Sequence, residues 1–100
     1  MATSKIKPTI KTIDTGWIYL QGLTWTASAK GKYYLKDTDA IDVGLTSADR
    51  PIAIMQTNFG SQTASMVIQP YVRDDKKLSL LSTTNSFTAD AAVRYQIAYL

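Results

Sequence analysis

The chain has 100 residues, of which 45% are hydrophobic and 19% charged, with a formal net charge of +3. This length allows one domain with one hydrophobic core, and the composition excludes an intrinsically disordered chain. The absence of cysteine and histidine excludes disulfides, thiol chemistry, Ser-His-Asp or Cys-His catalysis and histidine-containing zinc sites.

The residue types favour strands over helices. Thr, Ser, Tyr and Trp are frequent, and all eight acidic residues are Asp, so the good helix former Glu is absent. Residues 1–9 are polar and basic and are expected to be a leader or linker, followed by a single domain over residues 10–100. No segment resembles a signal peptide, and the longest aliphatic run, residues 52–55, is far too short to cross a bilayer. We therefore expect a soluble protein that does not insert into membranes.

Alternating apolar and polar residues predict about eight strands, separated by turn signals roughly every ten residues. This spacing predicts an all-β fold, either an antiparallel β-sandwich or a jelly-roll-like barrel. The expected strands are residues 10–13, 17–26, 32–36, 41–45, 52–59, 64–73, 77–83 and 92–100.

The connections carry predictions of their own. Residues 14–16 are expected to turn the chain between the first two strands, and Gly22 to form a bulge in the second. Residues 46–49, which precede Arg50 and Pro51, form the only predicted helical turn. The clearest hairpin joins the sixth and seventh strands across residues 74–76.

The last strand has the strictest alternation in the chain. Its apolar stripe consists of Val93, Tyr95, Ile97 and Tyr99, with small or polar residues between them. Such a period of two is typical of a half-buried strand. We expect this strand to lie inside a sheet or in an interface.

No residue pattern predicts catalysis or a cofactor. Ser28 and Lys30 match a Ser-Lys pair only at the level of a short spacing. Asp37, Asp39 and Asp42 could flank a sugar or a cation, but two-carboxylate glycosidase chemistry needs a deep cleft that so small a chain has little material to build. The same segment departs from the EF-hand loop at three positions, which favours a solvated turn over a metal site.

Residues 30–36 place two tyrosines beside lysines and resemble a platform for single-stranded nucleic acid. Tyr33 and Tyr34 should point to opposite faces of their strand, so only one ring could take part. The low net charge is explained as well by solubility as by an anionic partner. A nucleic-acid-binding β-barrel therefore stays an alternative that the sequence does not favour.

Aromatic rings beside charged groups suggest a saccharide site. Trp25 stands at the end of its strand next to a turn, where an exposed ring is expected. Arg73 and Asp74 stand at the mouth of the predicted hairpin, and Tyr71 shares the face of Arg73, so a ring and a guanidinium could line one shallow groove. The candidate ligand-binding residues are Trp25, Tyr71, Arg73 and Asp74.

Three segments together resemble the C-terminal head of a bacteriophage tail fibre or receptor-binding protein: Gly16-Trp17-Ile18-Tyr19-Leu20, the hairpin over residues 67–80, and the closing strand over residues 93–100. The resemblance implies a homotrimer in the phage tail that is made in the host cytoplasm, contacts other virion proteins and binds a host cell-surface glycan without catalysis. It transfers no binding residue to this sequence. A purely structural virion component without a ligand, such as a decoration or tail-assembly protein, is the alternative.

Overall fold

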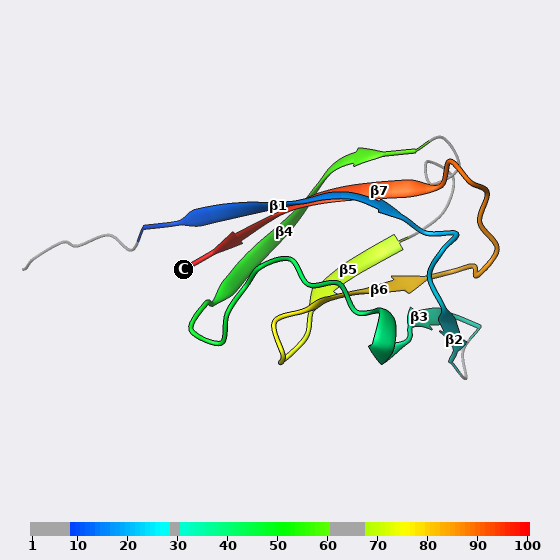
Figure 1. Cartoon of the computed structure of the whole chain (residues 1–100), viewed down its shortest axis with the longest axis horizontal. Coiled ribbons are helices and arrows are strands. Elements are labelled where there is room, and N and C mark those ends of the chain that lie inside the picture. Colours follow the sequence, from blue (N-terminus) through cyan, green and yellow to red (C-terminus); the bar gives the residue numbers. More distant parts are fainter. Residues whose placement is uncertain (1–8, 29–30, 61–67) are drawn as a thin grey trace, which may run out of the picture.

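A computed structural model describes residues 9–28, 31–60 and 68–100, which form two antiparallel β-sheets packed face to face (Figure 1). One sheet has the strand order β1-β7-β4 and the other the order β2-β3-β6-β5. The prediction of an all-β antiparallel sandwich is thereby confirmed, with two open sheets in place of a closed barrel. The strands are β1 (Lys11–Tyr19), β2 (Trp25–Ala27), β3 (Tyr33–Leu35), β4 (Pro51–Phe59), β5 (Ile68–Val72), β6 (Leu78–Ser82) and β7 (Ala92–Tyr99).

The last strand, β7, is the centre of its sheet. It pairs with β1 on one side and with β4 on the other. Val93, Tyr95 and Ile97 are fully buried, as the alternation predicts, because they point into the space between the sheets. The expectation that this strand is internal to a sheet is confirmed.

Strand β6 supplies the opposite side of the core. Leu78 and Leu80 are fully buried and belong to the same cluster as the apolar residues of β7. Their partners on β5, Val72 and Pro70, lie next to them in register. Burial of such aliphatic side chains stabilises the sandwich by roughly 1.5–3 kcal/mol each before the loss of conformational entropy is subtracted.

The turn predicted at residues 14–16 is wrong, because β1 runs through this segment as one strand. The extra residues form a bulge, where the register with β7 shifts between Asp14 and Trp17. Gly16 adopts a φ of 71°, a left-handed conformation that costs little without a Cβ. The Thr15 hydroxyl accepts a hydrogen bond of 3.1 Å from the Tyr95 backbone N–H, so tertiary pairing holds the bulge in the sheet.

The strand predicted over residues 17–26 is divided between the two sheets. Leu20 is fully buried, and its N–H donates to the carbonyl of Ala91, the residue before β7, at 3.0 Å. The Leu23 N–H then donates to the Leu20 carbonyl in a turn that also contains Gly22, and the chain enters β2. Gly22 thus lies in a turn between sheets and not in a bulge, because a period of two does not reveal where a chain changes sheets.

Two further predictions in the middle of the chain are corrected. The strand expected over residues 41–45 is reduced to an isolated bridge, in which Ile41 and Leu78 exchange two hydrogen bonds of 2.8 Å. Residues 46–49 form a turn without a helix, closed by a 3.0 Å bond from the Asp49 N–H to the Thr46 carbonyl. The short 3-10 helix η1 (Asp37–Asp39) lies in the segment for which the sequence favours a solvated turn.

The predicted hairpin is confirmed: β5 and β6 pair in antiparallel register and are connected across residues 74–76, with Lys76 in a left-handed conformation. The expected leader up to residue 8 and the first part of the sixth predicted strand, residues 64–67, lie outside the described residues. Nowhere in residues 9–28, 31–60 and 68–100 is there a helix with the length and hydrophobicity needed to span a membrane.

Candidate ligand-binding site

Three of the four predicted site residues lie together at the β5 edge of the second sheet. Pro70 stands in the middle of β5, where its missing N–H is tolerated because β5 is an edge strand that, among the described residues, pairs with β6 alone. Tyr71 pairs with Ser79 and is 44% exposed. Arg73 follows directly after β5, at the start of the hairpin turn.

The Arg73 side chain is held between two carboxylates. Its Nη1 lies 3.0 Å from Asp37 Oδ1, and its Nη2 lies 3.3 Å from Asp75 Oδ2. The Arg73 side chain is only 26% exposed, whereas the Asp37 side chain is 87% exposed. Asp37 belongs to η1 and is brought to the hairpin by the nearby Ile41–Leu78 bridge. This positions an acidic group that can still accept hydrogen bonds from a ligand.

The turn itself presents a further acid. Asp74 is exposed, and its carboxylate has no partner among the residues that the structure describes. A backbone bond of 2.8 Å from the Arg73 N–H to the Lys77 carbonyl closes the turn, and Asp75 accepts a bond from the Lys77 N–H. A hollow of about 490 Å³ is lined by residues 71–75.

A second hollow, of about 290 Å³, adjoins the first. It lies between the two edge strands β4 and β5 and is lined by residues 51–54 and 70–72. Tyr71 and Val72 line both hollows. The combined surface, which we call the Tyr71 groove, therefore carries apolar side chains at the end formed by β4 and charged side chains at the end formed by the hairpin.

Trp25 does not lie with the other three residues. It is on β2, at the opposite edge of the four-stranded sheet from β5. Its ring is half-buried, with its centroid 5.2 Å from that of Phe87, and its Nε1 donates to the Leu20 carbonyl at 3.5 Å. The expected exposed ring is thus replaced by a side chain packed against the margin of the core.

The other sequence candidates serve local structure. Asp37 binds Arg73, Asp39 accepts a bond from the Thr24 N–H at 2.6 Å, and Asp42 accepts one from the Gly44 N–H at 2.9 Å. No group of three potential metal ligands converges within the described part of the chain. Tyr33 and Tyr34 point to opposite faces as expected, whereas Lys30 of the proposed platform lies outside the described residues.

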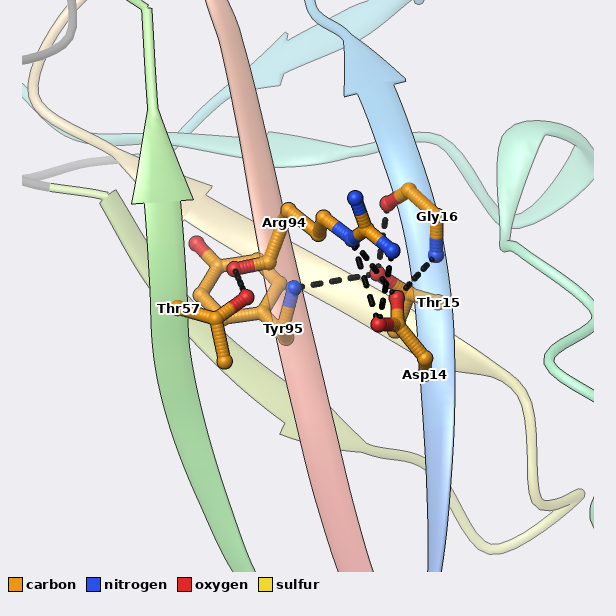
Figure 2. A network of polar contacts seen from close by, with 6 residues as sticks. All are labelled: Asp14, Thr15, Gly16, Thr57, Arg94 and Tyr95. Carbon is orange, nitrogen blue, oxygen red and sulfur yellow. Dashed lines mark hydrogen bonds and ion pairs between the residues drawn. The ribbon is translucent and has the colours of Figure 1, made fainter.

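The sequence analysis missed an ion pair on the outer face of the first sheet (Figure 2). The Arg94 side chain reaches from β7 to β1, with Nε 2.9 Å from Asp14 Oδ1 and Nη2 2.9 Å from Asp14 Oδ2. These bonds, together with one from the Gly16 N–H, lower the pKa of Asp14, and the carboxylate in turn raises the pKa of Arg94.

This pair fastens β1 to β7 beside the bulge. Trp17 lies opposite Arg94 in register and is 44% exposed, and Tyr19 on the same strand is 59% exposed. The partners are far apart in the sequence, so the only available signal was the alternation that places Arg94 on the solvent face of β7. We therefore interpret the Asp14–Arg94 pair as a structural feature, and the rings of Trp17 and Tyr19 are exposed on the same strand as Asp14.

No model of a known protein family matches the chain, and no curated protein and no solved structure matches it.

Proposed function

We propose that the chain is a non-catalytic adhesion module that binds a saccharide in the Tyr71 groove. The observation that carries the proposal is the position of Tyr71: an exposed ring shared by an apolar hollow and a charged one. Saccharides have both kinds of surface, because C–H groups cover the faces of the sugar ring and hydroxyls surround its rim. The groove offers a matching partner for each.

The charged end of the groove supplies donors and acceptors in a defined arrangement. Asp74 in the groove and Asp37 beside it, bonded to Arg73, can accept hydrogen bonds from hydroxyls, and Arg73 can donate them. The two carboxylates beside Arg73 restrict its rotamers before a ligand arrives, which reduces the entropy lost on binding. The hollow of about 490 Å³ lies within the range of roughly 300–1,000 Å³ for small-ligand sites, and the hollow of about 290 Å³ lies just below it.

The resemblance to phage tail-fibre heads supplies the biological setting for this proposal. In that setting the saccharide belongs to a host cell surface, and the chain is carried by a virion and contacts other virion proteins. A site at an edge strand and a hairpin turn suits this role, since loops on a rigid scaffold commonly carry recognition.

A glycan array probed with the purified chain tests the proposal. We expect binding to a restricted set of saccharides, and Tyr71→Ala should weaken it about tenfold or more, equivalent to about 1.4 kcal/mol. Tyr19→Ala is the matched control, because Tyr19 is an exposed tyrosine on the other sheet. The control should bind normally, and thermal unfolding should show that both variants are folded.

Two results would contradict the proposal. Absence of binding across the array would favour the purely structural virion component. Equal weakening by Tyr71→Ala and Tyr19→Ala would remove the site from the Tyr71 groove.

A further inference from the structure

The sandwich has four sheet edges within the described residues: β1 and β4 in the first sheet, and β2 and β5 in the second. An edge strand presents unpaired backbone N–H and C=O groups, which can pair with a strand of another chain. Proteins that must avoid such pairing shorten their edges, interrupt them with bulges, or place charges and prolines in them.

Three of the four edges are charged, very short or interrupted at their centre. β1 has the bulge at Gly16 and the charged side chains of Lys11 and Asp14. β2 has only three residues. β5 has Pro70 at its centre, where it removes a backbone donor.

The fourth edge, β4, is long and uncharged. It has nine residues, and its single proline is the first of them. The sequence has no charged side chain over residues 51–72, although 19% of the chain is charged. Ile52, Met55 and Phe59 are 51%, 61% and 54% exposed. Within the described residues, β4 pairs with β7 on one side and with no strand on the other.

We propose that β4 pairs with β4 of a second copy of this chain, in an antiparallel arrangement about a two-fold axis. A two-fold contact brings each surface against itself, so a charged surface would meet like charges. Two copies with a net charge of +3 each repel overall. The uncharged edge is where the repulsion is least and where exposed apolar side chains gain most from burial.

The register of β4 locates the centre of the contact. Shifts against β7 between Pro51 and Ala53, and again between Gln56 and Asn58, bend the strand at both ends. Regular strand geometry is therefore confined to residues 53–56. In the dimer, Met55 lies opposite the partner's Met55 and Ile54 opposite the partner's Gln56, with exposed apolar side chains on either flank. The inference does not depend on saccharide binding, and it replaces the homotrimer that the resemblance implies. Ala53 and Ile54 also line the Tyr71 groove, so the second copy would border the end of the groove formed by β4.

The test is light scattering of the purified chain over a range of concentrations up to high micromolar. We expect a dimer, and Met55→Lys should shift it to a monomer because two ammonium groups would face each other near the axis. Ile10→Lys is the matched control: Ile10 is 60% exposed and lies outside β4. The control should remain a dimer.

A second measurement covers the case in which Met55→Lys disturbs the fold. Amide hydrogen exchange of the wild-type chain should slow over residues 53–56 as the concentration rises, whereas exchange in β1 should not change. A monomer or a trimer in the wild type, a persistent dimer in folded Met55→Lys, loss of the dimer in Ile10→Lys, or concentration-independent exchange in β4 would each overturn the two-fold pairing.

Discussion

The buried hydroxyl of Tyr95 yields the sharpest stability prediction. Tyr95 is fully buried between the sheets, and its Oη has no hydrogen-bond partner among the described residues. An unsatisfied buried polar group costs about 1–3 kcal/mol. Tyr95→Phe keeps the ring and removes the hydroxyl, so the free energy of unfolding should rise by about 1–2 kcal/mol at neutral pH. For a domain of this size, each 1 kcal/mol shifts the Tm by roughly 4–8 °C.

The same side chain predicts a pH dependence. Burial raises the pKa of the Tyr95 phenol above its ordinary value of about 10. The unfolded chain then loses this proton at a lower pH than the folded chain does. The stability contributed by the neutral phenol is complete below about pH 10 and is lost as the pH rises toward the folded-state pKa. Between about pH 10 and the folded-state pKa, the free energy of unfolding of the wild type should fall by about 1.4 kcal/mol per pH unit relative to that of Tyr95→Phe.

The assay is urea unfolding of both proteins at neutral pH and at several values between about pH 8 and 11. Tyr19→Phe, at an exposed tyrosine, is the control and should follow the wild type throughout. A destabilisation of more than about 1 kcal/mol by Tyr95→Phe at neutral pH would mean that the hydroxyl has a partner, such as an internal water. Parallel alkaline declines of the wild type and Tyr95→Phe would refute the reasoning on the pKa.

Two further predictions concern the margins of the two sheets. Trp25→Ala should lower the free energy of unfolding, measured by urea unfolding, by about 2–4 kcal/mol, because the ring packs on Phe87 and the core. Trp17→Ala, at an exposed tryptophan, should change it by less than about 1 kcal/mol, and equal effects would contradict this packing. The Asp14–Arg94 pair lowers the pKa of Asp14, so it stabilises the fold above about pH 4 and loses that effect as the pH falls. The difference in the free energy of unfolding between the wild type and Asp14→Asn should therefore shrink in acid and in high salt. A constant difference would show that the pair contributes nothing.

Much of the fold could be predicted from local patterns. The alternation in residues 92–100 predicted a buried strand, and the paired alternation around residues 74–76 predicted the β5–β6 hairpin. These patterns work because the side chains of a strand alternate between its two faces wherever the strand lies. The opposite faces of Tyr33 and Tyr34 follow from the same rule.

Errors arose where the chain meets residues distant in sequence. Residues 14–16 have the composition of a turn, but the hydrogen bonds that Thr15 and Asp14 accept from β7 keep them in a strand. Residues 17–26 have the alternation of one strand, but the contact of Leu20 with Ala91 marks the point at which the chain leaves the first sheet. No local pattern encodes such partners.

For the candidate site too, some features follow from the sequence and others only from the tertiary structure. The sequence by itself determined that Tyr71 and Arg73 adjoin one hairpin, because two residues of the same strand face stay together in any sandwich. Only the tertiary structure decided that Asp37 joins them, since the Ile41–Leu78 bridge brings its segment to the hairpin, and that Trp25 lies at the opposite edge of the sheet. Strand order and sheet crossings depend on which apolar faces pack together, and that choice is made by the whole chain.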